Sequence, residues 1–300
     1  MRILVSGSSG LVGTALREAL GAAGHTVERL RRGVGPSRPG WVTWDPTVNM
    51  FDPVAAEGAD AVVHLAGASI AEGRWTKERK RVLRSSRIDA THHLVNELSK
   101  LKSPPKIFVS ASAIGYYGNR GDEVLTEKSE PAEDFLGRLA QEWETEARGA
   151  AKFGARVVLL RFGVILAKHG GALKKMLPPF KMGAGGPVGS GKQWMSWITL
   201  DDTVALIQHA LENHALEGPV NAVAPNPVRN RDFGRALGRV LRRPAFAPLP
   251  GFVARLMFGE MADALLLSST RVLPERLQTT GYAFRHPELD GALRAVLAGK

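Results

Sequence analysis

Apolar residues alternate between strand-like and helical spacing along the first half of the chain. Short strand-like runs fall at residues 3–5, 26–30, 41–45, 61–66, 107–112 and 156–166. Longer segments with helical spacing lie between them, over 76–101 and 135–153. Strands that alternate with helices form a parallel sheet covered by helices on both faces. The pattern therefore predicts a doubly wound α/β fold.

The pattern changes after residue 166. Residues 169–197 combine many glycines with Pro178, Pro179 and two tryptophans, which predicts an irregular cover over a pocket. A helix from Asp201 to Glu212, capped by Asp201 or Asp202, and a strand over 220–224 come next. Proline-broken helices then fill 228–300. We expect a main domain over 1–166 and a smaller, mostly helical substrate lobe over 167–300, with 201–224 returning to the main sheet.

A glycine-spaced turn follows the first strand. Gly7, Gly10 and Gly13 remove the side chains that would keep a phosphate from backbone N–H groups at the start of a helix near Leu11. Their spacing is GxxGxxG, not the standard GxGxxG, but the helix and the strand at 26–30 complete a β-α-β unit. We therefore expect a Rossmann-type domain that binds a dinucleotide through Gly7, Ser9, Gly10, Leu11, Val12 and Gly13.

The end of the second strand indicates which dinucleotide binds. A site for NAD usually places Asp or Glu there, to bond the ribose 2′-hydroxyl, whereas a 2′-phosphate favours a guanidinium. This chain has Arg31 and Arg32 at that point. The sequence therefore predicts NADP(H), with Arg31 or Arg32 holding the phosphate. The alternative is that both arginines simply face water.

Composition narrows the class of protein. The 300 residues are 44% apolar and 23% charged, which is ordinary for a globular protein and excludes a disordered chain. Cysteine is absent, which excludes disulfides and thiolate chemistry.

We see neither a signal segment nor an apolar run long enough to span a membrane, so we expect a cytoplasmic protein. The net charge of +11 is concentrated over 74–87, where a solvated basic helix is favoured over nucleic-acid binding.

Several motifs together resemble a known family. They are the glycine turn, Val62-Val-His-Leu-Ala-Gly67, Val109-Ser-Ala-Ser112 with Tyr116-Tyr-Gly118, and Arg161-Phe-Gly-Val-Ile-Leu166. They resemble the extended short-chain dehydrogenase/reductases of the nucleotide-sugar epimerase type. The segments 183–202 and 218–222 further resemble the atypical branch usually labelled "epimerase family protein". Some members of that branch carry a cell-division-inhibitor label, and its substrate is not established.

The resemblance implies roles for residues at the carboxyl ends of the strands. Leu65, Ala66 and Gly67 would line the cofactor, and Arg87 would stand where the family often has an asparagine near the cofactor. An arginine there could pair with a phosphate, or it could be one more surface charge of the basic helix. Arg161 is assigned to the cofactor site as well. Ser112 matches the serine that hydrogen-bonds the reacting oxygen of the substrate.

The family's acid/base pair, a tyrosine followed four residues later by a lysine, is absent. Phe135 and Leu139 stand at the matching positions, and no tyrosine occurs between Gly118 and Tyr282. Tyr116 or Tyr117 could supply the proton instead, with Ser112, or both could be half-buried loop aromatics. Glu127, Glu142 and Glu144 are other proton carriers, each with an easy interpretation as a surface residue. The sequence suggests no metal site.

Three residues of the glycine-rich segment, Lys192, Gln193 and Trp194, are candidate substrate contacts. The alternative is that this segment only makes a tight turn and packs the lobe. The leading hypothesis is an NADP(H)-dependent oxidoreductase or epimerase-like protein for an unknown carbonyl or carbinol, anionic or nucleotide-linked. A non-catalytic NADP(H) sensor is the main alternative, and an interaction protein of cell division or the membrane surface is the third. The sequence allows a homodimer.

Overall fold

The centre of the protein is an eight-stranded sheet. The computed structural model describes residues 1–299. The strands lie in the order β12-β8-β6-β5-β1-β2-β3-β4, and all neighbours are parallel except β3 and β4. Their bounds are β1 Arg2–Ser6, β2 Thr26–Arg31, β3 Trp41–Asp45, β4 Met50–Phe51, β5 Ala61–His64, β6 Ile107–Ala113, β8 Arg156–Phe162 and β12 Gly218–Ala222.

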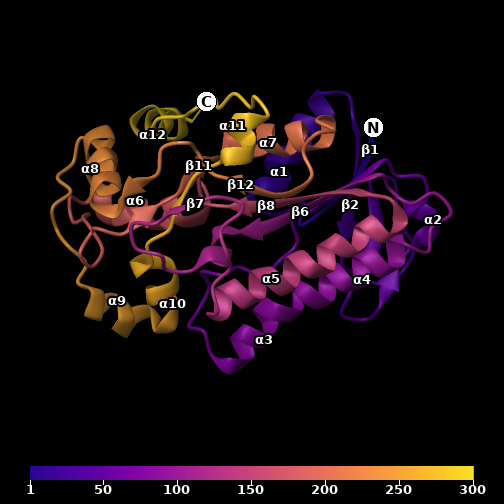
Figure 1. The fold of residues 1–300 in the computed structure, drawn as a ribbon, viewed down its shortest axis with the longest axis horizontal. Helices are drawn as coiled ribbons and strands as arrows, with labels where there is room; N and C mark the ends of the chain where they lie inside the picture. The colour runs from indigo at the N-terminus through magenta and orange to yellow at the C-terminus, as the bar shows by residue number, and fades with distance from the viewer. Residues whose placement is uncertain (300) are drawn as a thin grey trace.

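Helices cover both faces of this sheet (Figure 1). One face carries α1 (Leu11–Ala22), α7 (Leu200–Glu212) and α11 (Glu275–Thr279), and the other carries α3 (Lys77–Ser85), α4 (Ile88–Leu98) and α5 (Phe135–Arg148). Two apolar cores result, one on each side of the strands. The inner strands are buried on both faces, which explains why their sequences are almost continuously apolar. The predicted Rossmann-type α/β fold is confirmed.

The predicted strands are confirmed with small shifts at their ends, but the run over 156–166 forms two strands. After Phe162 the chain leaves the main sheet, and β9 (Val164–Leu166) pairs with β11 (Trp197–Thr199). The predicted helix over 76–101 is likewise two helices, because the chain bends at Ser86 and Arg87 between α3 and α4. Past α5, residues Gly149–Phe153 form a 3₁₀ helix instead of continuing the α-helix.

Two predictions about the second half were wrong. Residues 169–197 are not irregular throughout, because α6 (Gly171–Lys181) forms and buries Leu173, Leu177 and Phe180 against the lobe. Packing of this apolar face outweighs the cost of two prolines in the last turns. The cap of α7 is Thr199, not Asp201 or Asp202. Its hydroxyl accepts a hydrogen bond from the Asp202 N–H at 3.0 Å, so the helix starts one residue earlier.

Most of the remaining elements form a lobe at one end of the sheet, whereas α2 lies at the other end (Figure 1). There α6, α8 (Asn230–Leu241) and α12 (Leu289–Ala298) share one apolar cluster. The shorter elements are α2 Pro53–Ala56, β7 Val124–Leu125, β10 Trp194–Met195, β13 Val228–Arg229, α9 Gly251–Phe258, α10 Glu260–Ala262 and β14 Arg271–Val272. A π-helical turn, Asp263–Leu267, follows α10. None of the helices in residues 1–299 is long and apolar enough to cross a membrane.

Candidate cofactor site and a buried ionic network

The carboxyl ends of β1 and β5 meet at the glycine turn. Gly7 has φ +64°, and a Cβ added to it would lie 2.6 Å from the Leu65 carbonyl oxygen. A Cβ on Gly13 would lie 2.3 Å from the Gly7 carbonyl oxygen. Both positions therefore require glycine, because either side chain would push the turn away from β5 or from α1. Chain connections diverge on the two sides of β1, and dinucleotides bind at such a point in open α/β sheets.

The first turn of α1 leaves its backbone donors available. Gly10 is the N-cap in an extended conformation, with no side chain to accept from the N–H groups of the helix. Ser9 and Gly10 are exposed, whereas Leu11 and Val12 are half-buried and Gly13 is buried. Free N–H groups and the positive end of the helix dipole together favour a phosphate. The turn therefore has the shape and the electrostatics that a pyrophosphate needs.

A chain of buried hydrogen bonds supports the opposite wall of this turn. The N–H groups of Leu65 and Ala66 donate to Ser6 Oγ at 3.0 and 3.2 Å, and Ser6 Oγ lies 2.7 Å from His64 Nδ1. His64 Nε2 lies 3.0 Å from Thr91 Oγ1, and that hydroxyl donates to the Arg87 carbonyl. Burial lowers the pKa of His64 to about 4, so the ring is neutral near pH 7. The strand predicted over 61–66 contains His64, but the sequence did not reveal that Ser6 and Thr91 are its partners.

Arginines and one tryptophan line a cavity of about 280 Å³ at the end of β2. The guanidinium of Arg31 stacks over the Trp41 ring at 4.0 Å, and those of Arg29 and Arg38 lie 5.6 and 5.8 Å from the same ring. Arg31, Arg32 and Arg38 line the cavity, and the lining includes no carboxylate. The two arginines predicted from the sequence thus lie together, and Arg38 and Trp41 join them. Trp41 begins β3 beside β2, and Arg38 forms a bridge with Trp41, an arrangement that the sequence alone did not reveal.

Arg87 lies beneath the loop that follows β5. Its guanidinium donates to the carbonyls of Ala68 and Leu83, and its carbon would lie 3.3 Å from a Cβ added to Gly67. It also lies 5.2 Å from the Trp143 ring, and no carboxylate pairs with it within residues 1–299. Burial, and to a smaller extent Arg79, lowers the pKa of Arg87 to about 10. Arg87 is therefore not an ordinary surface charge of the basic helix.

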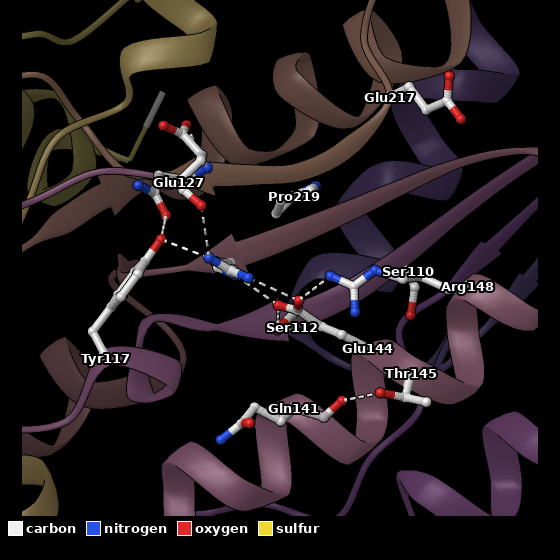
Figure 2. Close-up of polar contacts among 12 residues, drawn as sticks. Ser110, Ser112, Tyr117, Glu127, Gln141, Glu144, Thr145, Arg148, Glu217 and Pro219 are labelled. Atoms are coloured by element: carbon white, nitrogen blue, oxygen red, sulfur yellow. Dashed lines mark hydrogen bonds and ion pairs between the residues drawn. The ribbon is translucent and has the colours of Figure 1, made fainter. Parts of the chain in front are cut away.

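Glu144 is the centre of a buried ionic network (Figure 2). This carboxylate is 1% exposed and accepts four hydrogen bonds, from Ser112 Oγ at 2.8 Å, Arg148 at 2.9 Å, and Arg161 at 2.7 and 2.9 Å. Burial lowers the pKa of Arg161, but the hydrogen bonds and the charge of Glu144 outweigh this effect, so the pKa is raised. Sequence reasoning treated Glu144 as a surface residue. Its position on the sheet-facing side of α5 makes that interpretation wrong.

The network also changes how Ser112 and Arg161 are interpreted. Ser112 is 3% exposed, and its hydroxyl hydrogen is donated to Glu144, on the α5 side of the sheet. Arg161 is 2% exposed and divides its donors between Glu144 and the Tyr117 hydroxyl at 2.8 Å. Neither placement favours the role predicted from the sequence. Arg161 has no open side toward a cofactor, and Ser112 has no hydrogen left to donate to a substrate oxygen.

The two neighbouring tyrosines have different surroundings. Tyr117 is fully buried and donates to Asn221 Oδ1 at 2.7 Å, and burial raises its pKa to about 12, opposed by Arg161. Tyr116 is half-buried, with its ring 3.5 Å from the Arg161 guanidinium carbon. Within residues 1–299 the Tyr116 hydroxyl has no hydrogen-bond partner. Of the two, Tyr116 alone has a hydroxyl free to meet a ligand.

An apolar cluster occupies the positions of the family's tyrosine and lysine. Leu139 is 6% exposed and packs with Trp75 and Trp143, and Phe135 is half-buried with its ring 5.4 Å from that of Trp75. This side of α5 therefore offers no proton donor.

Within residues 1–299 there is no group of three histidine, aspartate or glutamate residues placed to hold a metal ion.

The three candidate substrate residues also differ in their surroundings. The Gln193 side chain is 6% exposed and donates to the carbonyls of Val188 and Leu266 at 2.9 and 2.8 Å, so it ties two segments of the lobe together. The guanidinium carbons of Arg229 and Arg271 lie 4.3 and 4.5 Å from the centre of the Trp194 ring. Asp122 accepts from Trp194 Nε1 at 3.0 Å and pairs with Arg229 at 2.7 Å. Lys192 is exposed. Of the three, Trp194 and Lys192 are the better candidates for contact with a ligand.

The fold and the glycine turn define a dinucleotide-binding α/β protein, and comparisons identify its family. The model of the NAD dependent epimerase/dehydratase family matches residues 3–223, and a domain of unknown function, DUF1731, matches 249–296. This chain belongs to the NAD dependent epimerase/dehydratase family. The predicted resemblance to epimerase-type short-chain dehydrogenase/reductases is thereby confirmed.

Relatives span the whole chain. Epimerase family protein Mb2239 of Mycobacterium bovis is 43% identical over 291 residues, covering 97% of this chain and 96% of that protein. The human epimerase family protein SDR39U1 is 38% identical over 304 residues, covering 99% and 100%. The crystal structure of human SDR39U1 with NADPH superposes with a TM-score of 0.92, at 36% identity and full coverage of both chains. A UDP-glucuronic acid 4-epimerase from Bacillus cereus, at 18% identity and TM-score 0.78, shares the fold.

The neutral state of His64 predicts a pH dependence of stability. Its pKa is lower in the fold than in the unfolded chain, so its contribution is present above about pH 6.5 and is lost as the pH falls toward 4. Between pH 7.5 and pH 5 we expect this residue to account for a loss of about 2 kcal/mol in unfolding free energy. Urea unfolding of the wild type, His64→Asn and His64→Gln at both pH values measures it. Equal losses in all three proteins would contradict the assignment.

Two glutamates on α5 provide a matched test of the network. Glu144→Ala leaves the Arg161 charge buried without its partner, and we expect a loss of about 3–5 kcal/mol in unfolding free energy. Glu142→Ala removes a half-exposed carboxylate that pairs with Arg84 at the surface, which costs about 1 kcal/mol or less. Chemical denaturation of both variants at pH 7 distinguishes them. Similar losses would mean that Glu144 is not the centre of the network.

Proposed function

We propose that the protein binds NADP(H) and exchanges hydride between the nicotinamide and a carbonyl or carbinol substrate. The observation that carries the cofactor assignment is the cavity at the end of β2, lined by Arg31, Arg32 and Arg38 without a carboxylate. Guanidinium groups favour a 2′-phosphate, whereas a ribose 2′-hydroxyl favours an acid. The human relative solved with NADPH, 36% identical, supports the same choice.

If the 2′-phosphate occupies that cavity, the other parts of the cofactor can be assigned to neighbouring segments. The glycine turn and the free N–H groups of α1 receive the pyrophosphate, and Leu65, Ala66 and Gly67 form the wall beside it. Arg87, beneath Gly67 and without a carboxylate partner, adds positive charge to that wall. Trp41 holds three guanidinium groups near the cavity, which limits their freedom before a ligand binds. When bound, NADP(H) supplies the hydride donor or acceptor.

Tyr116 is our candidate for the proton step. It lies in the 3₁₀ turn Ile114–Tyr117 directly after β6, and its hydroxyl is free within residues 1–299. The Arg161 guanidinium lies against its ring, with the guanidinium carbon 3.5 Å from the ring centre. Trp194, with the Arg271 guanidinium near its ring, and the exposed Lys192 are candidate contacts for an anionic part of the substrate.

A second candidate function is NADP(H) binding without turnover. The observation that favours it is the replacement of the family's acid/base pair by Phe135 and Leu139, together with the hydrogen bond that occupies the Ser112 hydroxyl. In such a sensor, the fraction of protein molecules with NADPH bound would depend on the NADPH concentration. The two candidates share the cofactor site and differ only in whether Tyr116 meets a substrate.

The cofactor assignment predicts a selective loss of affinity. Arg31→Ala and Arg38→Ala each remove a charged donor from the cavity, so we expect NADPH to bind about 10- to 100-fold more weakly in each variant. NADH affinity stays within about twofold, because NADH lacks the 2′-phosphate. Calorimetric titration with both dinucleotides measures this. Arg81→Ala, on the exposed side of α3, is the control. Parallel losses for NADPH and NADH would refute the assignment.

The tyrosine assignment predicts that two adjacent Phe variants behave differently. Tyr116→Phe lowers hydride transfer by about 10²- to 10⁴-fold and leaves NADPH affinity unchanged. Tyr117→Phe leaves buried partners of its hydroxyl unsatisfied, so it costs about 1–3 kcal/mol of stability but leaves turnover per folded molecule unchanged. Nicotinamide absorbance in the presence of a panel of carbonyl compounds is the readout. If NADPH binds tightly and no compound is reduced by the wild type, the sensor function stands in place of the enzyme.

A further inference from the structure

An apolar cluster lies where the carboxyl ends of three central strands meet α5. Leu65 directly follows β5, Ala111 belongs to β6, and Phe162 ends β8. All three pack in one cluster with Phe135 and Leu139 of α5, and we call this whole cluster the edge cluster. Ligands of open α/β sheets bind outside the carboxyl ends of the strands. The edge cluster therefore borders the place where such a ligand would lie.

The order of the strands directs the nicotinamide half of the cofactor toward this cluster. The cavity assigned to the 2′-phosphate lies at the end of β2, and the glycine turn follows β1. In the sheet, β2 lies on one side of β1, whereas β5, β6 and β8 lie on the other. A dinucleotide with its phosphates at these two places extends across β1, so its nicotinamide lies over the ends of β5 and β6. This step rests on the proposed function, and it brings the substrate beside the edge cluster.

The lobe completes the edge cluster with further apolar side chains. Met261 of α10 is buried in it, and Phe258 of α9 and Leu265 of the π-helical turn pack against it. Helices α9 and α10 lie on the same side of the sheet as α3 and α5 (Figure 1). Phe258 and Leu265 are half-buried, as are Phe135 and Phe162 on the other side of the cluster. Apolar surface thus remains accessible where the main domain and the lobe meet.

Polar side chains around the edge cluster are largely committed to the protein. Trp75 Nε1 donates to the Ile70 carbonyl at 2.9 Å, Arg87 donates to two backbone carbonyls, and the Ser112 hydroxyl donates to the buried glutamate of α5. Trp143 Nε1 is buried without a hydrogen-bond partner within residues 1–299. Such surroundings suit a group with one acceptor oxygen. The hydroxyls of a sugar would lose their hydrogen bonds to water there without replacement.

We propose that the reacting end of the substrate is apolar: an aliphatic or aromatic aldehyde, ketone or alcohol whose hydrocarbon part packs on the edge cluster. In the direction of reduction, the carbonyl carbon accepts a hydride from NADPH and the oxygen accepts the proton of the Tyr116 hydroxyl. The products are an alcohol and NADP⁺, and the phenolate regains a proton from water. The proposal concerns the reacting end alone, so contacts of a more distant anionic part with Lys192 are independent of it.

A homologous series of aldehydes tests the proposal on the full-length wild type with NADPH. From butanal through hexanal to octanal, kcat/KM should rise about three- to fourfold for each added methylene, because each methylene that leaves water contributes about that factor. Glyceraldehyde and xylose should react at least about 100-fold less well than octanal, since their hydroxyls find no partners. Equal kcat/KM for butanal and octanal, or a preference for glyceraldehyde, would overturn the proposal.

A binding measurement applies even if the protein holds NADPH without turnover. Calorimetric titration of the NADPH-bound protein with 1-butanol, 1-hexanol and 1-octanol should show the same increase in affinity with chain length. Affinity that does not change with chain length would overturn this proposal and leave NADPH binding intact. Failure to bind NADPH would instead overturn the proposed function, and this proposal with it.

Two phenylalanines of α9 provide matched variants. Phe258→Ala removes a ring that packs against the edge cluster, so it should lower kcat/KM for octanal, or the affinity for 1-octanol, by about tenfold, and should affect butanal less. Phe252→Ala removes a ring that is 71% exposed, and each of these values should stay within about twofold of the wild type. Unchanged NADPH affinity verifies the fold of both variants. Equal losses in the two variants would mean that octanal binds elsewhere, and would overturn the proposal.

Discussion

The close approach of β1 and β5 at their carboxyl ends is the constraint on which the rest of the cofactor site depends. The backbone at Gly7 passes so near the Leu65 carbonyl that a single methyl group would separate the strands. On the other side, Ser6 Oγ binds the N–H groups of Leu65 and Ala66, which fixes the wall at that separation. The N-terminus of α1, the loop over Arg87 and the arginine cavity all take their positions from these two strands.

Electrostatics in this protein divide between an open site and a closed one. The cavity at the end of β2 gathers positive charge without a carboxylate, so an anion from outside can complete it. Glu144 and Arg161 instead pair with each other under the sheet, and the half-exposed Arg148 binds Glu144 from the surface. Ser112, Tyr117 and Asn221 take part in the remaining hydrogen bonds. The first arrangement is suited to binding. The second fixes β6, β8, β12 and α5 in register and has little capacity to bind a ligand.

Sequence reasoning predicted the fold class, the glycine turn and the pair Arg31 and Arg32, because these depend on local patterns: strand and helix periods, glycine spacing and neighbours in one strand. It missed Arg38 and Trp41, which reach the cavity only because β3 lies beside β2. It also misjudged Glu144. Sequence shows a glutamate on a polar helix, and burial appears only when α5 packs over Arg161. Ser112 was located on the correct strand, but the side of the sheet that its hydroxyl faces depends on the register of β6.

In the chain of hydrogen bonds from Ser6 to Arg87, the donor and the acceptor of each bond are fixed. Two backbone N–H groups occupy the Ser6 oxygen, so its hydrogen must point to His64 Nδ1, and the Thr91 hydroxyl is already committed as donor to the Arg87 carbonyl. The imidazole therefore has to carry its one hydrogen on Nε2, directed at Thr91. A single tautomer, fixed from both ends, links the cofactor wall to the start of α4. A movement of that wall on ligand binding would therefore change the hydrogen bonds of the His64 ring. The ¹⁵N chemical shifts of its two nitrogens would report this change.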